Sequence, residues 1–269
     1  MTLRVVSLNV WGGRLHAPLM EYLASCGADV LCLQEVVRTP ASEADWLVYR
    51  DGSHELLQRA NLYEEIRAAL PTHDAFFAPA ARGDLFDGET IVPSEFGLAT
   101  FIRSDLPVIA QAMDFVHGGF SGNGWGGHPR ARNAHCFRLM DYEDGFTVTI
   151  AQMHGLRDTA GKGDTPARRE QARALAGLVG NVRREGERLI VCGDFNVLPD
   201  SVTFDELGRL GLSDLVTTRG FSDTRTSYYE KNGRFADYML VTPEVDVRHF
   251  DVVAAPEVSD HRALLLDFR

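Results

Sequence analysis

The chain has 269 residues and a mass of 29.8 kDa, a length that suits one large α/β domain or two small ones. Hydrophobic residues make up 45% of it and charged residues 24%, which is typical of a globular protein with a sizeable core. The net charge of −11 argues against a broad basic surface that binds nucleic acid by neutralising its phosphates. A local basic groove, or a metal that supplies the positive charge, is compatible with this balance.

The first residues, MTLRVVSLNVWGG, begin a strand pattern at once and lack the basic and apolar regions of a secretory signal. No apolar run approaches the roughly 18 residues that cross a bilayer. Cys26, Cys32, Cys136 and Cys192 are scattered without CxxC pairs, so we expect reduced thiols, with Cys32 and Cys192 in buried strands. We therefore expect a cytoplasmic protein without membrane contact, and no feature indicates a protein partner.

Strand patterns recur along the chain, and helical patterns fall between several of them. The first expected helix is His16–Ser25, and a second follows a polar connector at Glu55–Leu70. The clearest helix is expected to begin at Thr165-Pro166, where a threonine N-cap precedes proline at the first helical position, and to end near Gly186. The expected strands are Arg4–Val10, Asp29–Val36, Phe96–Arg103, Ala134–Met140, Phe146–Met153, Arg188–Cys192, Phe235–Val241 and Ala263–Phe268.

Many strands with few helices, and no strict alternation of the two, predict a mixed sheet or two packed sheets flanked by helices. No linker rich in proline, glycine or serine divides the chain, so we expect residues 1–269 to form one domain. The exception to compactness is the glycine-rich segment His117–Arg132, since a loop of this length is usually functional or mobile.

One strand pattern runs directly into polar residues in the sequence VCGDFNVLPDS, where Asp194 and Asn196 follow Cys192. Residues two apart on an extended chain point the same way, so a carboxylate and an amide would face a common point. Each such residue alone has an ordinary explanation as a turn cap, a solvated strand end or a hydrogen-bonded histidine. Further polar residues lie at or near the ends of apolar strands: Asn9, Glu35, His154, Asp237, Asp260 and His261.

Together these residues fit one chemical task. Strand ends in α/β folds open onto a crevice where ligands bind. Carboxylates and amides offer the hard oxygen ligands that Mg²⁺ or Mn²⁺ prefers, and histidines near carboxylates provide acid–base groups and hydrogen-bond donors. This set suits the hydrolysis of a phosphate ester.

The blocks SLNVW, LQEV, QMHG, GDFNVLPDS, ADYMLV and SDHRALL resemble, in their order, those of the endonuclease/exonuclease/phosphatase superfamily, the deoxyribonuclease-I-like fold. The resemblance covers nearly the whole chain, from Asn9 to His261, and GDFN combined with SDH before the last strand is a specific pairing. It implies an α/β (α+β) fold built as a four-layer αββα sandwich. In that fold two mixed β-sheets pack face to face, helices flank them, and the active site lies at one edge of the paired sheets.

The resemblance also implies a divalent metal, Mg²⁺ or Mn²⁺. Glu35 matches the principal metal ligand, with Asn9 beside it, and Asp260 would complete the metal environment or bind a second ion. The residues that we expect in or around the metal site are Asn9, Glu35, Asp194, Asn196, Asp260 and His261.

Catalytic roles follow from the same matching positions. Asp194 would orient or deprotonate the attacking water, and Asn196 would hold the phosphate and orient Asp194. His261 would donate a hydrogen bond to the scissile phosphate, while Asp237 fixes its tautomer and favours its charged form. His154 would be the second histidine that contacts the phosphate. Glu95 either pairs with His154 or is a polar residue at a strand start.

Substrate choice depends on loops. Trp125, Arg130 and Arg132 lie in the glycine-rich segment, where an aromatic ring and arginines would suit a nucleotide, although a flexible surface loop would look the same. The cations that follow His154 would steer a phosphate, although Arg168 and Arg169 could equally form a solvated helix face. They are Arg157, Lys162, Arg168 and Arg169.

These features favour a phosphodiesterase or nuclease that acts on a nucleotide or nucleic-acid end. The first alternative is a phosphomonoesterase for a small sugar- or inositol-phosphate. The second, from another class, is a catalytically inactive binding domain with the same fold.

Overall fold

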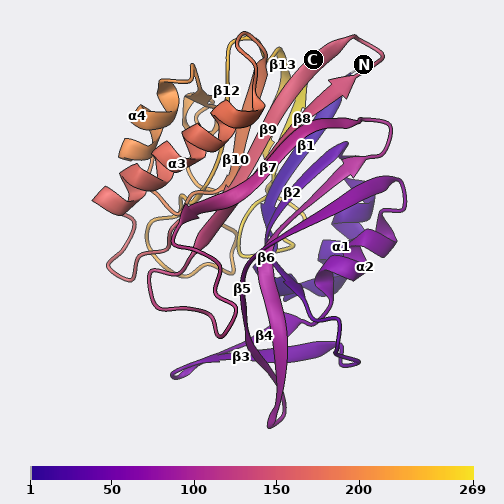
Figure 1. The fold of residues 1–269 in the computed structure, drawn as a ribbon, viewed down its shortest axis with the longest axis vertical. Coiled ribbons are helices and arrows are strands. Elements are labelled where there is room, and N and C mark those ends of the chain that lie inside the picture. Colours follow the sequence, from indigo (N-terminus) through magenta and orange to yellow (C-terminus); the bar gives the residue numbers. More distant parts are fainter. Residues whose placement is uncertain (1) are drawn as a thin grey trace.

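Two β-sheets pack face to face, and helices cover the outer surface of each sheet (Figure 1). The computed structural model describes residues 2–269. The eight-stranded sheet has the order β13-β14-β1-β2-β6-β5-β3-β4, and the six-stranded sheet has the order β11-β12-β10-β9-β8-β7. Both sheets are mixed, because β1 pairs parallel with β2 and β9 pairs parallel with β10, whereas β1 and β10 pair antiparallel with β14 and β12.

The strands of the eight-stranded sheet are β1 (Leu3–Asn9), β2 (Val30–Arg38), β3 (Trp46–Asp51), β4 (His54–Arg59), β5 (His73–Asp87), β6 (Thr90–Arg103), β13 (Val247–Val252) and β14 (Leu264–Phe268). Those of the six-stranded sheet are β7 (Val108–His117), β8 (Arg132–Asp141), β9 (Phe146–His154), β10 (Arg188–Asp194), β11 (Ser213–Asp214) and β12 (Asp237–Val241). The helices are η1 (Trp11–Gly13), α1 (His16–Ser25), α2 (Leu62–Ala69), α3 (Pro166–Val182), α4 (Val202–Gly208) and α5 (Leu215–Thr218).

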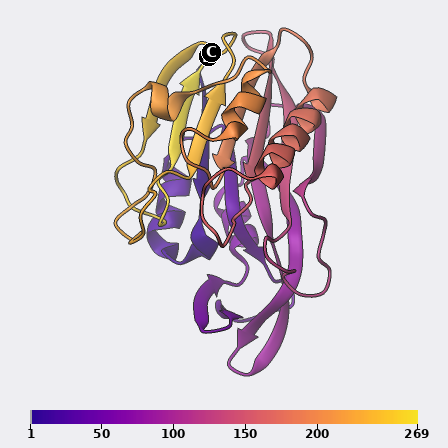
Figure 2. The same cartoon turned by 90° about the vertical axis from the view of Figure 1, so that its left-hand side faces the viewer.

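The apolar core follows from the alternation of side chains along each strand. Val5 on β1 belongs to a cluster that fills the space between the two sheets and continues through strands β8 to β10 to helix α3 on the outer face. The next residue, Val6, points the other way and packs in a second cluster with α1 and α2. Figures 1 and 2 show α3 and α4 on the outside of the six-stranded sheet and α1 and α2 on the far side of the molecule. The four-layer αββα sandwich is therefore confirmed.

One expected helix is wrong in its first half. Residues 54–59 form the strand β4, which pairs with β3 from Trp46↔Arg59 to Asp51↔His54, and the helix α2 covers only Leu62–Ala69. The pairing with β3 across the Gly52 turn overrides the local helical pattern. The α3 helix begins as expected, with Thr165 Oγ1 accepting from the Arg168 amide at 3.3 Å, but it ends at Val182, before Gly186.

The strands β5 and β6 are 15 and 14 residues long and extend below the sandwich in Figure 1, where β3 and β4 lie across them. The glycine-rich segment between β7 and β8 packs against this extension of strands β3 to β6, which we call the arm. The Arg82 amide of β5 donates to Ser121 O at 2.7 Å, and the Gly124 amide donates to Arg82 O at 3.0 Å. The expected long loop is thus partly ordered by backbone pairing.

Two further expectations concern cysteines and membrane segments. All four cysteines are free thiols, of which Cys32, Cys136 and Cys192 are buried and Cys26 is partly buried. Within residues 2–269 no helix is both long enough and apolar enough to cross a bilayer.

Candidate active site

The strand register brings three of the expected residues into one row across the six-stranded sheet. Asp194, the last residue of β10, lies opposite His154 on β9 and opposite Asp237 on β12. Gly193 permits the close approach of β9, since its φ is 134° and a Cβ would lie 2.1 Å from Met153 O. The glycine of GDFN is therefore required by backbone geometry.

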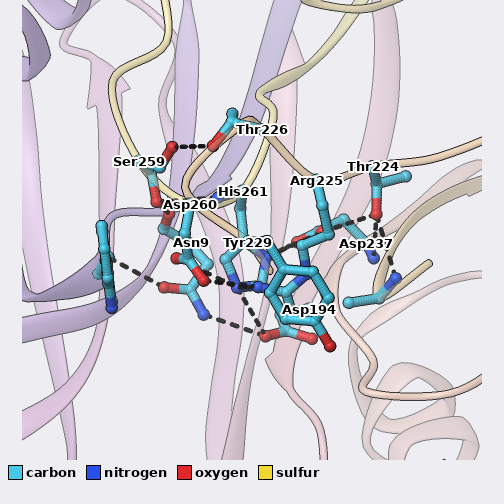
Figure 3. Close-up of polar contacts among 12 residues, drawn as sticks. Asn9, Asp194, Thr224, Arg225, Thr226, Tyr229, Asp237, Ser259, Asp260 and His261 are labelled. Carbon is cyan, nitrogen blue, oxygen red and sulfur yellow. Dashed lines mark hydrogen bonds and ion pairs between the residues drawn. The ribbon is translucent and has the colours of Figure 1, made fainter. Parts of the chain in front are cut away.

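The eight-stranded sheet supplies the opposite side of the site from the ends of β1 and β2. Asn9 pairs in register with Gln34, and Glu35 follows at a bulge between β2 and β6. Bulges often re-aim a side chain next to active sites. Asn9 Nδ2 donates to Asp194 Oδ2 at 3.0 Å, so the two sheets meet directly at this pair (Figure 3).

Asp194 lies at the centre of the cluster and is 2% exposed. Its Oδ2 lies 3.7 Å from His154 Nε2 and 3.7 Å from His261 Nε2. Its Oδ1 accepts the Asn196 amide at 2.9 Å. His154 Nε2 also lies 3.7 Å from Glu35 Oε1. Asp194 thus contacts an expected metal ligand, Asn9, and both of the expected histidines.

Asp237 holds the His261 ring in place through contacts with its Nδ1. Its Nδ1 lies 2.8 Å and 2.9 Å from the two Asp237 carboxylate oxygens, and Thr224 Oγ1 donates to Asp237 Oδ2 at 2.9 Å. This contact fixes the tautomer that carries the proton on Nδ1. Asp237 as the partner of His261 is what the sequence predicts.

Burial of the ring opposes the charged form expected for His261. Burial, followed by the field of Arg225, lowers the pKa of His261 to about 4. Burial also raises the pKa of Asp237 to about 7, although Arg225 and Thr224 oppose this. Desolvation thus favours the neutral imidazole and opposes the attraction of the carboxylate. Burial, then Arg132, likewise lowers the pKa of His154 well below its usual value.

Backbone strain is concentrated at the site. Three non-glycine residues in the described chain have positive φ: Trp11 at 52°, Glu35 at 58° and Asn196 at 55°. Asn196 Nδ2 donates to Gly155 O at 3.2 Å, which holds the loop after His154. Left-handed backbone in non-glycine residues clusters at active sites and ligand clamps. Its presence at two expected site residues favours a functional geometry.

The donor set fits a hard divalent cation. Asp260 Oδ1 is buried and has no hydrogen-bond partner within residues 2–269, although Asp260 Oδ2 is paired with Arg225 at 2.9 Å. Burial raises the pKa of Glu35 to about 7, with the nearby Asp260 and Asp194 carboxylates adding to the shift. An orphaned buried oxygen and mutually repelling carboxylates are the features that a cation would satisfy.

A second set of side chains could also hold an ion, since Asp194, Asp237 and His261 offer ligand atoms within 4.8 Å of one another. Asp237 has both oxygens in contact with His261 Nδ1 and one of them bonded to Thr224. The Asp237–His261 pair is therefore a hydrogen-bonded unit, and the oxygen-rich side of Asn9, Glu35, Asp194 and Asp260 suits Mg²⁺ or Mn²⁺ better.

Two cationic side chains of the site do not lie at strand ends, so the pattern of polar residues after apolar strands does not predict them. Arg225 lies in the segment between α5 and β12, is 5% exposed, and packs over the Tyr229 ring at 4.3 Å. Lys162 donates to Gly233 O at 2.7 Å and lies 5.6 Å from the same ring. Burial, then Arg225, lowers the pKa of Lys162 to about 8, with Asp194 and Asp237 opposing the shift. The sequence marks Lys162 only as one of four cations after His154, and Arg225 follows no strand pattern.

Of the expected substrate-binding residues, Arg132 lies beside the cluster. It is 8% exposed and its Nε donates to Gly155 O at 2.9 Å. Burial lowers its pKa to about 10, while the Glu35 and Asp194 carboxylates oppose this.

Trp125 and Arg130 contact the arm. Trp125 packs against Tyr49 and Phe96, and Arg130 Nη2 lies 2.9 Å from Asp51 Oδ2. Within the described chain neither makes a hydrogen bond or ring contact with the cluster, so their contact with substrate stays a prediction.

Two other expectations are resolved by direct contacts. Glu95 Oε2 accepts from Arg38 Nη1 at 3.2 Å, and within residues 2–269 it makes no hydrogen bond with His154. Arg168 is neither solvated nor free to steer a phosphate. It is 1% exposed and donates to backbone carbonyls of the loop after His154, including Gly161 O at 2.8 Å.

The sequence and fold comparisons agree on the class of protein. The family model described as "Endonuclease/Exonuclease/phosphatase family" matches residues 6–261, and the chain belongs to this family. No curated protein sequence matches the chain.

Solved structures share the fold at low sequence identity. A family protein from Bacteroides vulgatus is 19% identical with a TM-score of 0.71, covering 100% of this chain and 99% of that one. The mannosyl-6-phosphatase Bt3783 of Bacteroides thetaiotaomicron is 18% identical with a TM-score of 0.68, covering 99% of each chain. TDP2 of D. rerio, solved with a single-strand DNA product, is 16% identical with a TM-score of 0.68, covering 100% and 99%. Members of the family are mostly metal-dependent phosphoric ester hydrolases.

Proposed function

We propose that the protein is a divalent-metal-dependent phosphodiesterase that cleaves a phosphate ester of a nucleotide or nucleic-acid end. The observation that carries the proposal is the position of Asp194, which lies within hydrogen-bond reach of Asn9 and 3.7 Å from each of two buried histidines. A carboxylate with metal-type ligands on one side and imidazoles on the other has the parts that water attack on a phosphoryl group requires.

Each residue has a role in this proposal. Asp194 orients the attacking water and accepts its proton, and the Asn196 amide at 2.9 Å keeps the carboxylate in place. His154 and His261 line the phosphoryl position, and Asp237 fixes the ring of His261. Asn9, Glu35 and Asp260 would hold the cation. Mg²⁺ or Mn²⁺ bound there would offset the negative charge of the phosphoryl oxygens.

An aromatic pair beside Asn9 supports a substrate with a planar group. The Trp11 amide donates to Asn9 Oδ1 at 3.0 Å, and the Trp11 ring lies 6.2 Å from that of Tyr228. Tyr228 is 49% exposed, so its ring is available for stacking on a nucleobase, an interaction that tolerates any base.

A second candidate is a phosphomonoesterase for a small sugar- or inositol-phosphate. The observation that favours it is the presence of three cationic side chains, Arg132, Lys162 and Arg225, that interact electrostatically with Asp194. A monoester carries more negative charge than a diester and gains more from such a field.

Hydrolysis assays separate these activities. We expect turnover of bis(p-nitrophenyl) phosphate with Mn²⁺, loss of turnover with a chelator, and recovery when Mn²⁺ is restored. Turnover of p-nitrophenyl phosphate alone would favour the phosphomonoesterase. The absence of turnover of either compound by folded, Mn²⁺-supplied protein, together with binding of Mn²⁺, would instead favour the inactive binding domain.

A further inference from the structure

Arg225 is an arginine with a fixed position and a rigid environment. Its backbone forms an isolated bridge with His261, and the flanking Thr224 carbonyl accepts the Arg262 amide at 2.9 Å. Its guanidinium packs over the Tyr229 ring at 4.3 Å (Figure 3). Stacking on the flat face of a guanidinium leaves the N–H groups at its edges free for other partners.

One edge of this guanidinium is occupied. Nη1 lies 2.9 Å from Asp260 Oδ2 and also donates to His261 Nε2. Because Nδ1 of the same ring is bonded to Asp237, both nitrogens of His261 are engaged in the ligand-free arrangement. The cationic group beside His261 is therefore Arg225, whose charge also interacts with the Asp194 carboxylate.

The other edge of the guanidinium has no acceptor. Nε is buried without a hydrogen-bond partner, and Nη2 makes no hydrogen bond within residues 2–269. Nε–H and the adjacent Nη2–H form the fork that binds two oxygens of a phosphate or carboxylate. The unused edge belongs to a side chain that is 5% exposed and surrounded by catalytic-type groups.

A purely structural role explains only part of this arrangement. The Asp194, Asp237 and Asp260 carboxylates attract the charge of Arg225, and a lysine would supply such a charge equally well. A buried donor without an acceptor destabilises the folded protein. A ligand that brings its own oxygens would remove this cost.

We propose that Arg225 binds the phosphoryl group of the substrate directly, through its Nη2 and Nε edge beside His261. This inference rests on the proposed function, since it assigns a further residue to the same site. The ligand class is a tetrahedral phosphoryl group with at least two non-bridging oxygens. Tyr229 acts as a positioning residue, since its ring holds the plane of the guanidinium.

Binding of inorganic phosphate tests the proposal without turnover. Isothermal titration with phosphate, with Mg²⁺ supplied, should give a Kd about tenfold or more higher for Arg225→Met than for the wild type, as expected for loss of a charge-assisted bidentate contact. Arg225→Lys should fall between the two, because it keeps the charge and loses the fork. Arg219→Met, at an exposed position after α5, removes the same charge and should leave the Kd unchanged. Equal Kd values for all four folded proteins would overturn the proposal.

Turnover gives a second readout that a structural role would not move. With bis(p-nitrophenyl) phosphate, Arg225→Ala should lower kcat/KM on the order of 10²-fold, and added guanidinium ion should restore part of this loss when matched NaCl does not. If Arg225→Ala does not fold, the Arg225→Lys variant carries the test through its KM. Wild-type turnover with unchanged kinetics in folded Arg225 variants would contradict this inference and leave the proposed function intact. Arg225-dependent phosphate binding without any turnover would do the reverse.

Discussion

The side-chain amide of Asn9 donates a hydrogen bond to the Asp194 carboxylate at 3.0 Å. The two residues are 185 positions apart and end strands in different sheets. This contact joins the edges of the two sheets, so that residues from both surround one point. The proposed chemistry depends on this contact between the two sheets.

Removing the central carboxylate should abolish most activity while the fold persists. Asp194→Asn keeps the shape and the Asn196 contact but cannot accept a proton, so we expect kcat to fall on the order of 10²-fold or more. His261→Ala should have a similar effect, because it removes the ring that Asp237 and Arg225 hold beside Asp194. Steady-state kinetics on bis(p-nitrophenyl) phosphate measure both. His249→Ala, at an exposed position on β13, is the matched imidazole control, and near-wild-type kcat in Asp194→Asn would refute its assigned role.

Glu35 should bind the cation at a cost to the stability of the metal-free protein. Its pKa is raised to about 7 from 4.5 by burial, then by Asp260 and Asp194, so the folded state binds more protons than the unfolded state between these values. Stability of the metal-free protein should therefore fall as pH rises from 4.5 to 7 through this group. Glu35→Gln should raise the Tm at pH 8, and this gain should shrink below pH 4.5.

The same variant should bind Mn²⁺ at least about tenfold more weakly, since even indirect partners of a metal contribute this much. In the wild type, Mn²⁺ affinity should weaken as pH falls below 7, because protons compete for Glu35. Thermal scans in chelator and Mn²⁺ titrations across pH give both readouts. Unchanged Mn²⁺ affinity in Glu35→Gln would remove Glu35 from the metal site.

The aromatic pair should recognise the nucleoside part of the substrate. Tyr228→Ala should raise KM for thymidine 5′-p-nitrophenyl phosphate about tenfold, as expected for the loss of one stacking partner, with little effect on methyl p-nitrophenyl phosphate. Tyr142, which is 73% exposed in the turn between β8 and β9, provides the matched control Tyr142→Ala. An equal change of KM for both substrates would argue against base stacking.

Arg168 should stabilise the loop that follows His154. Its guanidinium donates to carbonyls of Leu156, Gly161, Gly163 and Asn196, so Arg168→Met leaves buried acceptors unpaired. We expect a loss of about 3 kcal/mol in the free energy of unfolding, measured by urea denaturation. Arg169→Met, on the same helix, leaves the Glu206 carboxylate paired with Arg173 and Arg209 and should cost less than about 1 kcal/mol. Equal losses in the two variants would contradict the structural role.

Sequence patterns predict the buried strands well, because their apolar residues report on burial directly. The strand expected at Phe146–Met153 is found at Phe146–His154, and the one at Arg188–Cys192 is found at Arg188–Asp194. The outer strands are harder to predict. The strand β5 has charged and small residues with Pro79 inside it, and it is stabilised by pairing with β6 over its whole length. Such pairing is a tertiary property that a local pattern does not contain.

The candidate site shows a similar difference. The sequence predicts its residues at strand ends but not its residues in irregular segments. Residues in the blocks GDFN and SDH are placed by strand ends, and the structure brings Asn9, Asp194, His154 and His261 together. Arg225 could not be found this way, because it lies in an irregular segment, and the pairing of that segment with His261 is a tertiary contact. The substrate contact predicted for Trp125 rests on its residue type. Its neighbours Tyr49 and Phe96 come from strands distant in sequence, so the sequence pattern does not reveal them.

We propose that the strand ends of the two sheets hold a divalent cation beside Asp194. Anomalous diffraction from crystals soaked in Mn²⁺ tests it most directly. We predict a strong Mn²⁺ peak in contact with the Glu35 carboxylate, on the side of Asn9 and Asp260. A fully soaked crystal with no peak near Glu35, or with Mn²⁺ bound only elsewhere, would contradict the account.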